Sequence, residues 1–360
     1  MNLKELSSLL GLSQTTVSRA LNGYPEVSEA TRLRVQQTAM RHNYAPNARA
    51  KGLATGRALT IGHVIPNAHN HEMVNPVFGD FISGVGEIYA SSGYDMIMSI
   101  VPTGAELDTY RTMAARASVD GVVVHAPAMT EPRIALLNEL GLPFVVHGRA
   151  SNETAPYSWL DVNNTSAFRR AGDFLLDLGH RRIALINGLE TMDFAHRRRR
   201  GYEAALTARG IGIDPALMRS GEMTEVIGYK SAREMLAGPD APTAFVTSSM
   251  ISAMGVRRAI FDAGLQMGRD VSVVTFDDDL SYLKNGDEVP IFTATRSSVR
   301  EAGRALASML LAQIKNPGAP VQTRLMEADL IAGTSTGPAP GSAGPTRGPT
   351  RTPSAAGLQA

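Results

Sequence analysis

The first 22 residues constrain the fold of this chain more than any other stretch, because they read as two short helices joined by a tight turn. Asn2 can cap the first helix, and Glu5 stands three residues later, as in a capping box. Gly11 follows the last apolar position of that helix, where a residue that tolerates positive φ is favoured. Ser13 can cap the second helix, whose polar residues gather at its start. A helix, a turn and a second helix with a polar N-terminus form the geometry that enters a DNA major groove.

The charge is distributed unevenly along the chain. Residues 1–57 hold eight Lys and Arg against three Glu, a net +5, which leaves −4 for the rest because the total is +1. A basic head on a slightly acidic body predicts a polyanionic partner for the head alone. The chain has no cysteine, which excludes disulfides and cysteine-based metal sites. No stretch approaches the roughly 20 apolar residues of a membrane span, and the N-terminus lacks a secretory pattern, so we expect a cytoplasmic protein with no membrane partner.

From Leu59 onward, apolar strands alternate with helices. We expect strands at residues 60–65, 94–100, 121–125, 143–147, 182–186, 217–220, 243–247 and 271–276. This rhythm predicts an α/β fold with parallel sheets covered on both faces, in two consecutive units. A cleft between the units, at the carboxyl ends of the strands, is the expected ligand site. Gly84-Val-Gly86 lacks the third glycine of a dinucleotide-binding fingerprint, so we interpret it as a helix-packing site.

Residues 12–23, Leu-Ser-Gln-Thr-Thr-Val-Ser-Arg-Ala-Leu-Asn-Gly, resemble the recognition segment of the LacI/GalR family of bacterial transcription regulators. Residues 27–32 and 44–50 are similar to the segments that follow it in that family. The core resembles the family's periplasmic-binding-protein architecture, which implies two Rossmann-like subdomains. The resemblance covers residues 1–334. Within the family, the Gln-Thr-Thr recognition helix and the Phe-Val-Val-His-Gly-Arg strand are most similar to regulators of alpha-glucoside utilisation.

The resemblance implies a division of the chain into four parts. We expect a three-helix helix-turn-helix DNA-binding domain over residues 1–45, a hinge helix over 46–57, and an effector-binding and dimerisation core over 58–334. Subdomain 1 of the core should span about 58–160 and 292–318, and subdomain 2 about 161–290 and 320–334. Residues 335–360 are rich in Gly, Pro, Ala, Ser and Thr, which predicts a disordered tail.

The DNA-contacting residues follow from matching the family's motif position by position. The resemblance assigns base reading to Gln14, Thr15 and Arg19, and Arg19 has the geometry to bind guanine O6 and N7 together. It assigns phosphate contacts to Asn2, Ser13, Ser18, Asn22 and Thr31. In the hinge, the minor-groove positions are Asn47, Leu53 and Ala54, with Leu53 as the wedge that opens a base step. The alternative is a flexible linker with an incidental leucine.

The effector-binding residues are expected at strand ends that face the cleft. The candidates are Asn75, Pro76, Phe78, His147, Arg149, Arg198, Ser249 and Asp277. Carboxylate and guanidinium groups beside an aromatic ring suit a polyhydroxylated sugar. Two alternatives to an effector-binding role stay open. Arg197–Arg200 could be a solvated basic helix face, and Asp277–Asp279 could cap the next segment. Ser249-Met250 stands where many family members have Asn-Asp, which puts the effector contacts there in doubt.

These features predict a homodimeric, sequence-specific repressor that binds a palindromic operator under the control of a small ligand, expected to be a sugar. The alternative is a sugar- or nucleoside-binding protein without a DNA role. We do not expect an enzyme, because no P-loop and no zinc-ligand spacing is present. His69 and His71 lack a third ligand, so we expect no metal or other cofactor.

Overall fold

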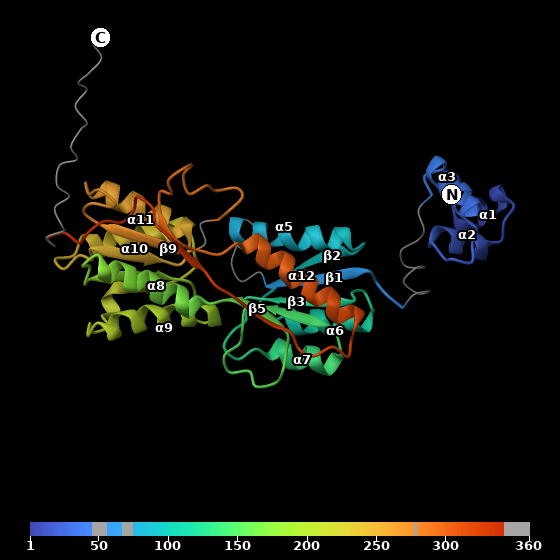
Figure 1. The fold of residues 1–360 in the computed structure, drawn as a ribbon. Helices are drawn as coiled ribbons and strands as arrows, with labels where there is room; N and C mark the ends of the chain where they lie inside the picture. The colour runs from blue at the N-terminus through green and yellow to red at the C-terminus, as the bar shows by residue number, and fades with distance from the viewer. Residues whose placement is uncertain (45–55, 67–74, 277–278, 342–360) are drawn as a thin grey trace, which may run out of the picture.

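The head is a small helical unit in the computed structural model, which describes residues 1–44, 56–66, 75–276 and 279–341. Its described residues form α1 (Leu3–Leu10), α2 (Gln14–Leu21) and α3 (Glu29–Arg41), shown in Figure 1. Both halves of the predicted capping box are present at Asn2 and Glu5, and Gly11 adopts φ 65°. Ser13 caps α2 as predicted. Apolar side chains from all the head helices meet in one core of Leu6, Leu10, Val17, Ala20, Val27, Val35 and Ala39.

The first sheet of the core is parallel throughout, with the strand order β11-β5-β4-β3-β1-β2 among the described residues. Its strands are β1 (Thr60–Pro66), β2 (Asp95–Val101), β3 (Gly121–His125), β4 (Phe144–His147), β5 (Trp159–Val162) and β11 (Thr323–Met326). Helices α5 (Pro76–Ser91) and α12 (Val299–Lys315) pack on one face, and α6 (Glu106–Ala115) and α7 (Pro132–Leu140) on the other. Burial on both faces explains why β3 and β4 read as continuous apolar runs.

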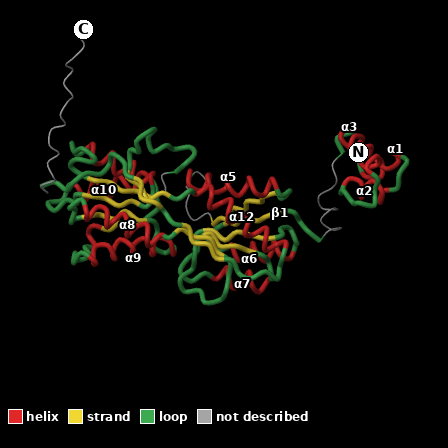
Figure 2. The backbone as a smooth tube through the Cα atoms, in the orientation of Figure 1, coloured by secondary structure: helices red, strands yellow, loops and turns green. Residues whose placement is uncertain are grey.

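The second sheet has the order β12-β10-β9-β8-β6-β7 in the part of the chain that the structure describes, and only β12 runs antiparallel there. Its strands are β6 (Ile183–Asn187), β7 (Met218–Ser220), β8 (Ala244–Thr247), β9 (Ser272–Phe276), β10 (Thr293–Arg296) and β12 (Asp329–Ile331). The flanking helices are α8 (Asn164–Asp177) with α9 (Asp193–Ala208), and α10 (Glu225–Leu236) with α11 (Met250–Asp262). A short 3-10 helix, η2 (Pro215–Leu217), leads into β7. Figure 2 shows the strands of each sheet as a separate group with helices around it.

Helix pairs on the sheets approach closely where each partner carries a glycine. A Cβ atom at Gly84 of α5 would collide with the Arg300 carbonyl of α12, and one at Gly303 with the Phe81 carbonyl. The pairs α8 with α9 and α10 with α11 repeat this arrangement at Gly172 and Gly201 and at Gly228 and Gly255. Gly84 therefore serves helix packing, as its sequence context predicted.

The chain passes between the sheets after β5, after β10 and after β11. The chain therefore crosses later in the sequence than the subdomain boundaries expected at about residues 290 and 320. β10 still belongs to the second sheet, and β11 still pairs with β5 in the first sheet. Strand β11 was missed because it is short and mostly exposed, so its sequence carries no apolar run.

The predicted start of the tail at residue 335 is wrong. Ser335 is fully buried beside the second sheet. Its hydroxyl oxygen accepts a hydrogen bond from Thr293 N at 2.8 Å. Ser335 O accepts from Val273 N at 2.9 Å, and Ala339 N donates to Leu178 O at 2.8 Å. Polar side chains that pair with neighbouring backbone groups make this segment look like a linker in sequence. Across the described ranges, no helix combines the length and apolar character needed to cross a membrane.

Candidate functional site

The exposed surface of α2 presents the predicted base-reading side chains, with Gln14 and Thr15 in its first turn and Arg19 in its last. Gln14, Thr15 and Arg19 are all exposed, and within the described residues the Arg19 side chain has no hydrogen bond or ion pair. A hollow of about 430 Å³ beside them is lined by Ser13, Thr15, Arg19, Ser28 and Thr31, with further residues between α2 and α3. The three side chains are thus free to reach a base edge.

The predicted phosphate contacts sit at helix termini. Asn2 and Ser13 are the N-caps of α1 and α2, and Thr31 hydrogen-bonds Ser28, the N-cap of α3. The amide of Asn22 donates to Ser18 O at 2.9 Å, at the end of α2. Backbone amides at helix N-termini favour anions, so the placement of Asn2, Ser13 and Thr31 suits phosphate groups, whereas Ser18 and Asn22 lie at the C-terminal end of α2. Asn47, Leu53 and Ala54 of the expected hinge lie outside the described residues.

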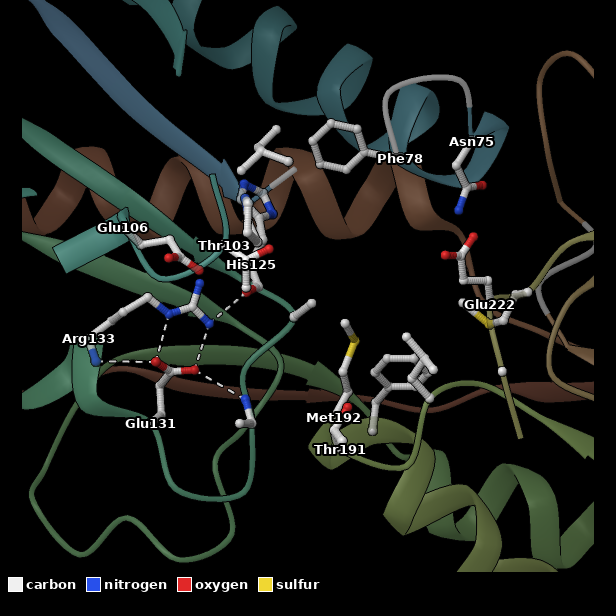
Figure 3. A pocket seen from close by; sticks show the side chains of 18 of the residues that line it. Asn75, Phe78, Thr103, Glu106, His125, Glu131, Arg133, Thr191, Met192 and Glu222 are labelled. Atoms are coloured by element: carbon white, nitrogen blue, oxygen red, sulfur yellow. Dashed lines mark hydrogen bonds and ion pairs between the residues drawn. The ribbon is translucent and has the colours of Figure 1, made fainter. Parts of the chain in front are cut away.

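A cleft of about 820 Å³ opens between the carboxyl ends of the two sheets (Figure 3). The first subdomain lines it with residues that include Asn75, Phe78, Thr103, Glu106, His125, Glu131 and Arg133. The second subdomain contributes residues that include Thr191, Met192, Phe194, Glu222 and Met223. The volume lies within the range of about 300–1,000 Å³ typical of small-molecule sites. Apolar faces and several carboxylates therefore surround a space large enough for a disaccharide.

The start of α5 brings three predicted effector residues into the cleft wall. Asn75, Pro76 and Phe78 all line the cavity. Asn75 is the N-cap of α5, and its side-chain oxygen accepts from Val77 N at 3.0 Å. Pro76 occupies the first turn, where the missing N–H costs nothing. Phe78 meets the His125 ring edge-on, with centroids 5.4 Å apart.

Arg149 and Arg198 are held behind the wall, in a hydrogen-bonded chain that spans the crossing from β5 to α8. Arg149 donates to Asp161 at 2.8 Å, and Asp161 accepts from the Asn164 amide at 3.2 Å. The Asn164 oxygen accepts from Arg198 Nε at 2.8 Å. Burial raises the pKa of Asp161, and the hydrogen bond and charge of Arg149 oppose that rise. The structure thus links the two predicted arginines through Asp161 and Asn164, which the sequence did not single out as site residues.

Arg198 also supports the cleft wall from beneath. Its guanidinium lies 4.0 Å from the Phe276 ring centroid and 4.8 Å from that of Phe194, which lines the cavity. It donates to Ser248 O at 2.8 Å. Weakly hydrated and planar, a guanidinium stacks on aromatic faces in this way. Arg198 is therefore placed to connect a cavity-lining ring to the end of β8.

Ser249 and His147, two further predicted effector residues, do not line the cavity. Ser249 is buried, caps α11 and hydrogen-bonds Ser252, and it is not among the residues that line the cavity. His147 stacks on Phe81 with centroids 4.0 Å apart and lies behind His125. Burial lowers the pKa of His147 to about 4, so this ring is neutral at physiological pH. Asp277 lies outside the described residues.

A buried ion pair in the wall was missed by the sequence reasoning. Glu131 and Arg133 join through bonds of 2.6 Å to both Arg133 Nε and Nη2, and Nη2 also donates to His125 O at 3.0 Å (Figure 3). Burial opposes the charge of Arg133, but the Glu131 hydrogen bond and charge outweigh it and raise the Arg133 pKa. The only sequence signal is Glu-Pro-Arg at a helix start, which is too common to mark a site.

The subdomains touch on either side of the cleft. On one side, Ser281 N donates to the Asp80 carboxylate at 2.7 Å. On the other, Asp193 N donates to Pro127 O at 3.0 Å, and the Asp193 carboxylate accepts from Ser151 N at 3.2 Å. Within the described ranges, no cluster of three or more His, Asp or Glu has the geometry of a metal site, and His69 and His71 fall outside them.

Known families match both the head and the core. The family described as bacterial regulatory proteins, lacI family, matches residues 2–47, and a periplasmic binding protein-like domain matches residues 173–336. The HTH-type transcriptional regulator AglR of Rhizobium meliloti is 44% identical over 340 residues, which cover 94% of this chain and 95% of that protein.

Solved structures agree with this likeness. A transcriptional regulator CelR–cellobiose complex aligns with a TM-score of 0.69 and 28% identity, covering 93% of this chain and 99% of that one. The lac repressor dimer bound to operator and the anti-inducer ONPF aligns with a TM-score of 0.80 at 24% identity, covering 94% and 99%, and shows the shared fold. With a recognition helix, a two-subdomain core and a 44% identical relative along nearly its whole length, this chain belongs to the LacI family of bacterial transcriptional regulators.

Proposed function

We propose that this protein is a cytoplasmic repressor that binds a palindromic operator as a homodimer and changes its DNA affinity when a glucoside of about disaccharide size occupies the cleft. The observation that carries the proposal is the presence of two separate sites in one chain. The head exposes Gln14, Thr15 and Arg19 on the surface of α2. The core holds a cavity of about 820 Å³ between its two subdomains.

The chemistry of the cavity wall supports a sugar. Glu106, Glu222 and Thr103 offer polar groups to hydroxyls, and Phe78 and Phe194 offer apolar faces to the sugar carbons. The CelR structure, a relative at 28% identity, contains cellobiose. Our choice of a glucoside rests on that complex and on the likeness of the recognition helix and of strand 143–147 to alpha-glucoside regulators. The ligand is bound and released unchanged in this proposal, so no catalysis is involved.

Exposed apolar side chains support the homodimer. Ile97 and Ile100 are 42% and 53% exposed on the edge strand β2, and Phe261 on α11 is 79% exposed. Apolar side chains left in water at an edge strand favour association with another chain. Sedimentation of the full chain at several concentrations tests this part, and a monomer at every concentration would contradict it.

The DNA and sugar parts are tested together by operator selection followed by titration. The full chain is used to select from a random duplex library, and the enriched sequence is expected to be an inverted repeat. The complex with that duplex is then titrated with maltose, sucrose, trehalose and cellobiose, with galactose as a control. At least one disaccharide should change the apparent affinity by a factor of ten or more, about the size of a typical allosteric coupling.

The outcomes separate the alternatives. An unenriched library would overturn the DNA-binding part, and a sugar-dependent rise in melting temperature without DNA selection would favour the plain binding protein. Selection of an inverted repeat with no response to any of the four disaccharides would overturn the glucoside part. A decrease in sugar concentration in the presence of protein alone would show turnover and contradict a pure binding role.

A further inference from the structure

Three histidines from neighbouring strands meet behind the cleft wall. His63, His125 and His147 come from β1, β3 and β4, which are adjacent in the first sheet. His63 Nδ1 lies 2.9 Å from His125 Nε2, and the Tyr89 hydroxyl lies 3.4 Å from His63 Nε2. These contacts form a line from Tyr89 through His63 to His125. Of the three rings, His125 alone lines the cavity among the described residues.

Burial keeps this line uncharged. It lowers the pKa of His63 to about 3, and it lowers the pKa of His125 well below the usual value, with the neighbouring histidines adding to both effects. Burial also raises the pKa of Tyr89. Each imidazole therefore carries a single N–H, and the position of that hydrogen in one ring dictates its position in the next.

Two proton arrangements are compatible with the distances. In the first, Tyr89 donates to His63 Nε2, His63 Nδ1–H donates to His125 Nε2, and His125 carries its hydrogen on Nδ1. In the second, every donor is reversed, so His125 Nε2–H donates to His63 and His63 Nε2–H donates to the Tyr89 oxygen. His125 Nδ1 is then an acceptor.

The two arrangements leave different groups unpaired. Tyr89 is 1% exposed and its hydroxyl has no other partner among the described residues, so the second arrangement leaves its hydrogen stranded in the core. The second arrangement also leaves His125 Nδ1 unpaired, since that atom is buried without a partner in the described structure. The first arrangement leaves only one group unpaired, the Nδ1–H of a cleft-lining ring. Unpaired buried polar groups are costly, so the first arrangement is favoured.

We propose that Tyr89, acting through His63, fixes the tautomer of His125, so that His125 offers an Nδ1–H donor to an oxygen of the effector when binding shifts the cleft wall and uncovers this buried atom. Tyr89 and His63 are positioning residues in this proposal, and His125 is the contact. The contact with an effector rests on the proposed function, because it requires a ligand in the cleft. The tautomer of His125 does not depend on the proposed function. The specificity that results favours ligands with a hydroxyl or ether oxygen at this wall over ligands with a donor-only group there.

The tautomer is measured directly by long-range proton–nitrogen NMR spectra of the full chain labelled only at histidine. Comparison with His125→Gln assigns the His125 signals. The expected result is a protonated Nδ1 and an unprotonated Nε2 at His125. A protonated Nε2 would overturn the proposal whether or not any sugar binds.

Tyr89→Phe tests the positioning role. Without the hydroxyl, each arrangement strands two groups, so the two tautomers of His125 should approach equal populations. Tyr94→Phe is the matched control, because it removes another buried hydroxyl from the same subdomain that has no contact with the histidines. An unchanged His125 tautomer in a folded Tyr89→Phe protein would contradict the relay.

The contact is tested with the four disaccharides named above. If one binds the wild type, His125→Leu should weaken it by about two- to tenfold, the range for one neutral hydrogen bond. Tyr89→Phe should weaken it by about twofold, since about half of the molecules would carry the competent tautomer. Tyr94→Phe should leave the affinity unchanged. Unaltered affinity in His125→Leu would overturn the contact, while failure of all four sugars with the wild type would count against the glucoside proposal and leave the NMR result to decide the tautomer.

Discussion

Arg19 lies in the last turn of the predicted recognition helix α2, its exposed side chain has no intramolecular partner among the described residues, and it is the side chain most suited to read a base. Arg19→Ala should reduce operator affinity by about 1–3 kcal/mol and relax the preference at one base pair per half-site. Arg19→Lys keeps the charge but loses the bidentate fork, so it should relax the preference while retaining binding to random DNA. Binding to operator variants by fluorescence anisotropy at fixed salt measures both effects, and equal operator affinity for all three proteins would refute the assignment.

The pair Glu131–Arg133 illustrates how an ion pair in the cleft wall affects stability. Arg133→Met leaves Glu131, which is 2% exposed, buried without its cation. Breaking a buried pair from one side costs about 3–5 kcal/mol, so urea unfolding should show a large loss. The double variant Glu131→Leu with Arg133→Met removes both charges and should recover most of that loss. A double variant no more stable than Arg133→Met would show that the pair contributes through its shape rather than its charge.

At the scale of elements, glycines set how closely helices approach. Gly84→Ala places a methyl group against the Arg300 carbonyl and forces α5 from α12, which should cost about 1–3 kcal/mol. Gly86→Ala, two residues along the same helix, meets nothing within 4 Å and should stabilise α5 by up to about 1 kcal/mol. Urea unfolding of both variants measures the difference. Equal effects would mean that α5 and α12 can separate without cost.

The sequence was most informative for elements whose residues carry a local signal. The Asn2 and Ser13 caps, Gly11 and the apolar runs of the buried strands predicted their own places. Strands β5, β10, β11 and β12 were not among the expected strands, because these short segments owe their existence to pairing with distant strands rather than to their own residues. The residues of the cleft divide in the same way, into some with a local sequence signal and some without one. Asn75, Pro76 and Phe78 follow a strand and line the cleft, but Glu131, Arg133 and Met192 reach it through loops whose paths depend on the whole fold.

At the scale of the whole molecule, buried neutral histidines make stability depend on pH. The folded pKa of His147 is about 4, below the unfolded value of about 6.5, so the unfolded chain takes up a proton first as the pH falls. The contribution of His147 to the free energy of unfolding is fully present above about pH 6.5 and is lost as the pH falls toward 4. Each such histidine should remove about 1.4 kcal/mol per pH unit in that window.

The unfolding free energy measured at intervals from about pH 7 to about pH 5 should therefore fall, and more gently in His147→Gln than in the wild type. Exposed His42 provides the control, because His42→Gln removes a histidine that lies on the surface of the folded head. Parallel curves for the wild type and His147→Gln would show that His147 becomes protonated in the folded protein.

The three passages of the chain between the sheets have a consequence for inheritance. Helix α12 and strand β11 complete the first subdomain but follow nearly all of the second in the sequence, so a single crossover between two genes cannot exchange one subdomain intact. The head, in contrast, is one uninterrupted segment with its own apolar core. A single recombination event within the family can therefore replace the whole head, whereas replacing either core subdomain intact takes more than one crossover.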